Sequence, residues 1–192
     1  MAYQMKIGLY FGSFNPIHIG HLIIAQHVLN VEKFSKIWFV VSPQNPLKAT
    51  TTLLNEYKRL HLCKLAIYDN PKFKAIDIEF KLPKPNYTIN TLTYLTEKYP
   101  QHQFTIIMGS DGYSNIKKWK NYETLLNTYK IIVYKRPNFI TLTAHQNVTI
   151  LEAPLLNISA TYIRNLLQNK QDITYLVTDA VKEELIKGNY YH

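Results

Sequence analysis

The chain is 192 residues long and 46% hydrophobic, enough to bury one sizeable core, so we expect a single domain, 1–192. No apolar run reaches the length of a membrane span, the chain enters a strand almost at once rather than a signal peptide, and a single cysteine excludes an internal disulfide, all of which favour the cytoplasm. Lys and Arg outnumber Asp and Glu by 22 to 13, and the net charge of +9 suits an anionic partner.

The spacing of apolar residues predicts alternating strands and helices. In chain order we expect a strand at 5–11, a helix at 19–32, a strand at 36–41, a helix at 55–68, a strand at 73–80, a helix at 89–98, a strand at 103–108, helical turns at 113–127, strands at 130–135 and 148–151, and helices at 160–168 and 175–187. This order is typical of an α/β fold, a Rossmann-like doubly wound parallel sheet with helices on both faces. The C-terminal helical part, 155–192, is expected to pack on it.

Four loops that follow predicted strands carry residues suited to ligand binding, namely Gly12, Ser42, Gly109 and Arg136. Ligands of open parallel sheets collect beyond the carboxyl ends of the strands. Four of the six glycines lie in just two of these loops, where glycine lets a ligand approach the backbone closely. Ordinary turn glycines are the alternative.

The junction between the first strand and the first helix reads Phe-Gly-Ser-Phe-Asn-Pro-Ile-His-Ile-Gly-His over residues 11–21. Such a junction presents free backbone N–H groups and the positive end of the helix dipole, which favour anions. It is neither a Walker loop nor a G-x-G-x-x-G fingerprint. His18 and His21 fall on one face of the first helical turn and can donate hydrogen bonds to phosphate oxygens. Surface or capping histidines are the alternative, while a zinc pair lacks a third ligand at usable spacing.

A second candidate anion site opens the helix at 160–168. Ser159 is a natural N-cap, and Thr161 and Arg164 share the outward face of the helix. A helix N-terminus with two hydroxyls and an arginine suits a phosphate group. Without the first motif, a capped surface helix with an exposed arginine would be the simpler interpretation.

Two further side chains follow the strand at 103–108. Asp111 can accept hydrogen bonds from ribose hydroxyls or orient a hydrated metal ion, or simply cap the next turn. Trp119 follows two lysines, and its ring needs either a stacking partner or a place in the core. From the residues alone, core packing is favoured for Trp119.

The stretch 12–21 resembles the H-x-G-H motif of the nucleotidyltransferase superfamily, in the form found in nicotinate mononucleotide adenylyltransferases. The resemblance covers nearly the whole chain, because further matches follow in the family's order at 42–48, 86–92, 108–111, 119, 135–138 and 158–164. Each match is weak alone, but the ordered set is specific. It implies an enzyme that transfers AMP from ATP to nicotinate mononucleotide, giving nicotinate adenine dinucleotide and pyrophosphate in NAD biosynthesis.

The resemblance also implies roles for individual residues. ATP would be bound by Gly12, Ser13, Phe14, His18, His21, Gly109, Asp111, Arg136, Ser159, Thr161 and Arg164. Of these, His18, His21 and Arg164 would be catalytic, because they supply positive potential to the reacting phosphates. The mononucleotide would be bound by Asn15, Lys48, Thr88 and Trp119, with the indole against the nicotinate ring, although Lys48 could equally be a solvated lysine. Mg²⁺ would be the cofactor, held mainly by the nucleotide phosphates rather than by a protein metal site.

Several alternatives stay open. Phe11 stands where many bacterial members have a second glycine and Asn15 replaces their aspartate, so an enzyme that accepts nicotinamide mononucleotide as well is one alternative. A phosphopantetheine adenylyltransferase shares both phosphate motifs but gives no reason for Thr88 or Trp119. A class I aminoacyl-tRNA synthetase fragment lacks its signature lysine loop. The charge and 15 tyrosines admit an RNA-binding module, but the lysines are scattered. We therefore expect ATP and nicotinate mononucleotide as partners, with no nucleic acid and no membrane, and leave a homo-oligomer open.

Overall fold

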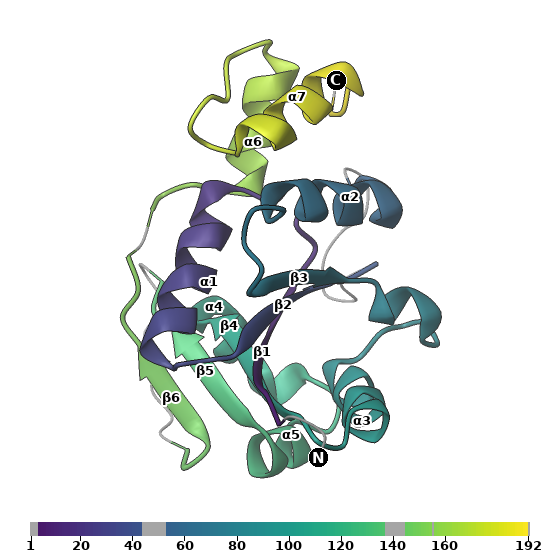
Figure 1. Ribbon diagram of the computed structural model, residues 1–192, viewed down its shortest axis with the longest axis vertical. Coiled ribbons are helices and arrows are strands. Elements are labelled where there is room, and N and C mark those ends of the chain that lie inside the picture. The colour runs from purple at the N-terminus through teal and green to yellow at the C-terminus, as the bar shows by residue number, and fades with distance from the viewer. Residues whose placement is uncertain (1–3, 44–52, 137–144, 155, 192) are drawn as a thin grey trace.

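The computed structural model describes residues 4–43, 53–136, 145–154 and 156–191 (Figure 1). The elements are β1 (Lys6–Gly12), α1 (Ile19–Val31), β2 (Lys36–Val41), α2 (Glu56–Ala66), β3 (Phe73–Ile76), the 3₁₀ helix η1 (Ile78–Lys81), α3 (Thr88–Lys98), β4 (Gln103–Gly109), α4 (Ser110–Tyr113), η2 (Ile116–Lys118), α5 (Tyr122–Thr128), β5 (Lys130–Tyr134), β6 (Val148–Leu151), α6 (Ala160–Gln168) and α7 (Asp179–Lys187). No helix within the described ranges has the length and apolar character needed to cross a membrane.

The six strands form one parallel sheet in the order β3-β2-β1-β4-β5-β6. This confirms the predicted doubly wound α/β fold. The order runs outward from β1 in one direction and from β4 in the other, so the topological switch lies between these two strands. In register, Gly12 at the end of β1 pairs with Val41, and Gly109 at the end of β4 pairs with Tyr134. Ligands of such sheets bind outside the carboxyl ends at the switch point, where both glycines lie.

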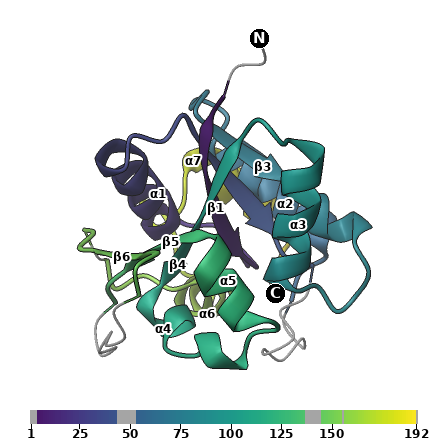
Figure 2. The ribbon, with the colours of Figure 1, turned by 90° about the horizontal axis from the view of Figure 1, so that it is seen from below.

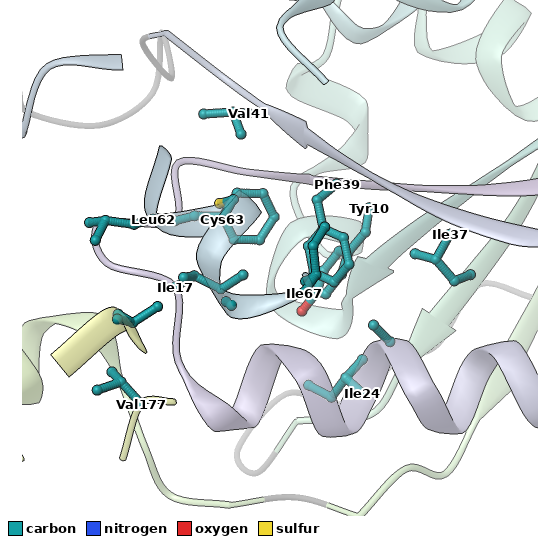
Figure 3. Packing of buried hydrophobic residues seen from close by; sticks show 14 of the residues in the cluster. Tyr10, Ile17, Ile24, Ile37, Phe39, Val41, Leu62, Cys63, Ile67 and Val177 are labelled. Atoms are coloured by element: carbon teal, nitrogen blue, oxygen red, sulfur yellow. The ribbon is translucent and has the colours of Figure 1, made fainter. Parts of the chain in front are cut away.

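Both faces of the sheet are covered, which explains the continuous apolar sequence of β2. Ile37, Phe39 and Val41 belong to a core cluster shared with α1 and α2, whereas Trp38 and Val40 belong to a second cluster shared with α3. Successive strand residues point to opposite faces, so a doubly covered strand needs apolar residues at every position. Figure 2 shows α1 on one side of β1 and α3 on the other, and Figure 3 shows Ile37 and Phe39 on the side where α1 carries Ile24.

The C-terminal helices lie beyond one end of the sheet, next to α2 (Figure 1). Ile163 and Leu167 of α6 and Val181 and Leu185 of α7 are buried in the same cluster as the residues of α1 and α2. Their burial places α6 close to the loop that joins β1 to α1. The described residues of α6 and α7 thus share a core with α1 and α2.

Three sequence predictions differ from the structure in their bounds or detail. The strand predicted at 73–80 ends at Ile76, because the chain turns into η1 and buries Ile78 and Glu79 there. The helical turns predicted at 113–127 are three short helices, α4, η2 and α5, with Asn121 in the left-handed conformation at a φ of 52° just before α5. The predicted helix 175–187 begins only at Asp179.

Candidate active site

The loop between β1 and α1 turns sharply at Phe14, whose φ of 44° is left-handed. The Phe14 ring is 2% exposed and packs edge-on against Tyr10, with centroids 5.8 Å apart. A Cβ atom on Gly12 would lie within about 3 Å of this ring, so glycine is required for the ring to fit below the end of β1. The side chain of Phe14 is thus part of the core, and only its backbone is left to meet a ligand.

The two histidines of the motif lie together at the start of α1. Their ring centroids are 3.7 Å apart, and the His18 backbone N–H donates to His21 Nδ1 over 3.2 Å. When the His21 ring is neutral, its proton therefore lies on Nε2, which is then a hydrogen-bond donor. A Cβ atom on Gly20 would approach the His18 ring to 3.1 Å, so this glycine makes room for the ring. The structure brings together the pair that the spacing predicted.

His18 is 7% exposed, and its Nδ1 makes no hydrogen bond within the described residues. Burial, with a smaller contribution from Arg136, lowers the pKa of His18 to about 4. At neutral pH the ring is therefore uncharged and can donate one hydrogen bond and accept another.

This pKa predicts acid sensitivity of the fold. Between pH 6.5 and pH 4, His18 is protonated in the unfolded state but not in the folded state. Its contribution to the unfolding free energy is therefore complete above pH 6.5 and is lost as the pH falls toward 4. We expect the group to account for about 2–3 kcal/mol of the loss in unfolding free energy between pH 7 and pH 4.5. Urea titrations of the wild type and of His18→Asn at both pH values measure it. Equal losses in the two proteins would contradict this assignment.

The second candidate anion site is joined to the first. Ser159 Oγ accepts a hydrogen bond from the Tyr162 N–H over 3.1 Å and so caps α6. From the same helix, the Arg164 guanidinium donates to Thr161 Oγ1 over 3.1 Å and to the backbone oxygen of Asn15 over 2.8 Å. The half-buried arginine thus connects the N-terminus of α6 to the loop between β1 and α1, residues 13–18, which we call the histidine loop. The two sites form one cationic region.

At the end of β4, an ion pair covers Gly109. Arg136 Nη1 lies 3.4 Å from Asp111 Oδ2, and the other guanidinium nitrogen is 3.3 Å from the Tyr134 hydroxyl. A Cβ atom on Gly109 would collide with Asp111 and lie 3.0 Å from Arg136 Nε. Both side chains of the pair are more than one-third exposed, so the pair contributes only about 0–1 kcal/mol and can open for a ligand.

The remaining candidates approach from the other face of the sheet. Thr88 is the first residue of α3, and Trp119 directly follows η2, half-buried against the cluster that contains Ile89 and Leu92. The histidine loop packs instead in the α1 cluster, so the structure does not place these two side chains directly on the His18–His21 pair. Lys48 lies outside the described residues.

Sequence reasoning missed Arg59, which is completely buried on α2. Its Nε donates to Leu54 O over 2.7 Å, Nη1 donates to Ser13 O over 2.5 Å and Ser42 O over 2.7 Å, and Nη2 donates to Pro43 O over 2.8 Å. Burial lowers the pKa of Arg59, but a guanidinium stays charged in proteins. One cation thus joins the loops after β1 and β2. The only available signal was its place on the apolar side of α2, beside Leu62 and Cys63.

Sequence reasoning also missed Glu79 of η1, which is 3% exposed. Its carboxylate accepts hydrogen bonds from Thr91 Oγ1 over 2.9 Å and from the Ser42 hydroxyl, while burial raises its pKa. Ser42 is therefore held on both sides, by Arg59 at its carbonyl and by Glu79 at its hydroxyl. The carboxyl end of β2 is fixed by these two buried groups.

Comparison with known proteins agrees with this geometry. Residues 9–166 match the family model described as Cytidylyltransferase-like. Probable nicotinate-nucleotide adenylyltransferases from Cytophaga hutchinsonii and Flavobacterium psychrophilum are 51% and 50% identical to the chain, covering 97% of it and 98% and 99% of their own lengths. The fold matches that of a Plasmodium falciparum nicotinic acid mononucleotide adenylyltransferase complexed with NaAD, at a TM-score of 0.80 and 22% identity over 97% of each chain. The chain therefore belongs to the cytidylyltransferase-like family and, by its full-length relatives, to the nicotinate-nucleotide adenylyltransferases.

Proposed function

We propose that this protein transfers the adenylyl group of ATP to nicotinate mononucleotide, giving nicotinate adenine dinucleotide and pyrophosphate, a step of NAD biosynthesis. The observation that carries the proposal is that His18, His21 and Arg164 lie in one region at the switch point of the sheet. The full-length relatives of the chain are named as probable nicotinate-nucleotide adenylyltransferases. We place the reaction in the cytoplasm, since the one cysteine, Cys63, is a buried free thiol.

The reaction needs positioning and charge stabilisation rather than an activated side chain. A phosphate oxygen of the mononucleotide attacks the α-phosphorus of ATP in line. The new P–O bond forms as the bond from the α-phosphorus to the bridging oxygen breaks, and pyrophosphate leaves with that electron pair. A phosphate monoester is already a nucleophile near neutral pH. The protein lowers the barrier by holding two anions in line and balancing the charge that develops.

The histidine loop and α6 supply that balance. His18 is neutral because of its burial, so it can donate a hydrogen bond to a phosphate oxygen without carrying a positive charge itself. His21 can donate from Nε2 when its ring is neutral. The start of α1 adds the positive end of a helix dipole, although the Ile19 and His21 N–H groups already donate to backbone oxygens. Arg164 and Thr161, at the start of α6, would hold the leaving pyrophosphate.

The adenosine half of ATP would lie at the end of β4. When the exposed pair between Asp111 and Arg136 opens, the carboxylate can accept hydrogen bonds from ribose hydroxyls, and the backbone of Gly109 becomes accessible. Ser13 and Phe14 would also contact ATP. Phe14 would do so only through its backbone, because its ring is buried.

Mg²⁺ fits this site as an ion carried by the phosphates. The side chains that converge here are mostly hydrogen-bond donors and cations, which suit phosphate oxygens better than a metal ion, so the nucleotide phosphates would be the main ligands of the ion. When bound, the ion neutralises part of the charge on the phosphates. His18, His21 and Arg164 would donate hydrogen bonds to phosphate oxygens of the substrates.

Trp119 is proposed to stack on the pyridine ring of the mononucleotide, next to Thr88, with Asn15 and Lys48 toward its phosphate. We expect Trp119→Ala to raise KM for the mononucleotide by about three- to tenfold, because an aromatic pair contributes about 0.5–1.5 kcal/mol, and to leave KM for ATP unchanged. Steady-state kinetics with each substrate varied in turn provide the measurement. Trp119→Phe should recover part of the loss, and equal rises for both substrates would indicate structural damage instead.

The proposal itself is tested by pyrophosphate release from ATP and Mg²⁺ with nicotinate mononucleotide, nicotinamide mononucleotide and phosphopantetheine in parallel. We expect strong preference for the nicotinate substrate. Comparable rates with acid and amide would define a dual-specificity enzyme, and turnover only with phosphopantetheine would overturn the assignment of the acceptor. Analysis of the product by mass separates transfer to the mononucleotide from simple hydrolysis of ATP.

A further inference from the structure

The C-terminal end of the chain reaches the histidine loop. The hydroxyl of Tyr191 donates to Asn15 Oδ1 over 2.7 Å, although the two residues are 176 positions apart. Asn15 is 6% exposed, and the Tyr191 ring packs against the core cluster that contains Ile17. A residue of the motif is therefore contacted by the last residue that the structure describes.

Asn15 is held by three separate segments. Its Oδ1 also accepts the backbone N–H of Leu54 over 3.1 Å, and its backbone oxygen accepts from Arg164 over 2.8 Å. Two donors on the same oxygen fix which way the amide faces, since the amide nitrogen cannot take that place. The side-chain orientation of Asn15 is thus fixed by the segment before α2 and by residues 188–191 after α7, which we call the C-terminal tail.

Tyr191 is suited to act as a constant donor. Burial raises its pKa well above the ordinary value for tyrosine, against smaller opposing effects of Arg164 and Arg59, so the phenol stays protonated throughout the working range of pH. Its backbone has a φ of 70°, a left-handed conformation that bulky residues rarely adopt. The surrounding contacts must hold it there. The hydroxyl of the neighbouring Tyr190 donates to Glu184 Oε1 over 3.0 Å, away from Asn15, and Lys58 Nζ lies 4.6 Å from the centre of the Tyr190 ring.

We infer that Tyr191 is a positioning residue for the mononucleotide site, acting through the amide of Asn15. The inference rests on the proposed function, which gives Asn15 contact with the mononucleotide. Loss of the phenol hydroxyl leaves Asn15 Oδ1 with one fewer donor, and the amide then samples orientations that do not bind the substrate. The C-terminal tail is in this way part of the active site, although it contains no group that touches a reacting atom.

Tyr191→Phe tests the inference, because it removes only the hydroxyl. We expect KM for nicotinate mononucleotide to rise about two- to twelvefold, the range that follows from loss of one net hydrogen bond, while KM for ATP stays at the wild-type value. The matched control is Tyr190→Phe, which removes a hydroxyl from the adjacent residue that bonds Glu184 instead of Asn15. This control should leave both KM values at those of the wild type.

A double-mutant cycle separates positioning from a general structural effect. If Tyr191 acts through Asn15, Tyr191→Phe in an Asn15→Ala background raises KM for the mononucleotide no further. A further rise in that background, an equal rise for both substrates in the single variant, or no rise at all overturns the inference.

The result also distinguishes this inference from the proposed function. A wild-type protein that converts neither nicotinate nor nicotinamide mononucleotide overturns both. A wild-type protein that is active, with Tyr191→Phe unchanged, overturns the positioning role alone.

Discussion

Replacement of His18 by alanine is expected to lower kcat about 100-fold or more, because removal of one preorganised donor to a developing charge typically costs 10²–10³ in rate. The imidazole is already buried and neutral at the start of α1, so it needs no reorganisation when the charge develops. KM for the two substrates should change far less than kcat, since the lost interaction is strongest in the transition state. Single-turnover rates with ATP and nicotinate mononucleotide measure the chemical step directly.

The fold should tolerate this substitution. Removal of His18 loses some packing but also removes a buried Nδ1 without a hydrogen bond in the described structure, so the unfolding free energy should change by about 1 kcal/mol or less. His61→Ala is the matched control, because it deletes a half-exposed imidazole on α2. A His18→Ala enzyme with wild-type turnover would refute the catalytic role of this histidine, as would a loss of activity that only parallels unfolding.

Replacement of Arg59 by leucine is expected to destabilise the protein by at least about 3 kcal/mol, because it leaves several buried carbonyl oxygens without their donor. For a chain of this size, that corresponds to a fall in melting temperature of roughly 6–12 °C. The carbonyls of Ser13, Ser42 and Pro43 would lose the group that holds the loops after β1 and β2 together. Differential scanning calorimetry and urea titration provide the two measurements.

The control for Arg59→Leu is Lys64→Leu, which removes the same charge and adds the same side chain at an exposed position of α2. It should change the unfolding free energy by about 0.5 kcal/mol or less. Arg59→Lys is expected to recover only part of the stability, because a single ammonium has three donors and cannot match the planar fork of the guanidinium. Wild-type stability in Arg59→Leu would show that the four hydrogen bonds contribute nothing net.

Much of the fold follows from local sequence. The apolar run at 37–41 predicts a strand buried on both faces, and Ser159 predicts the start of α6, where its hydroxyl does cap the helix. Both features depend on residues within a few positions of one another, and local periodicity and capping report such features well. The strand predicted at 73–80 shows the limit, because its second half leaves the sheet where Glu79 accepts hydrogen bonds from Thr91 of α3 and from Ser42, the residue after β2.

The sequence by itself determined the parallel α/β architecture and the family, because both depend on short sequence segments and on the order in which they occur. Only the tertiary structure decided how these segments meet. Arg164 reaches Asn15 across 149 positions, and Tyr191 reaches it across 176. Arg59 is completely buried, although it lies on a helix that also has a solvent-exposed side. The physical reason is that a hydrogen bond between distant residues leaves no periodic signal. It arises only when burial of the shared core brings the histidine loop, α6 and the C-terminal tail to the same end of the sheet.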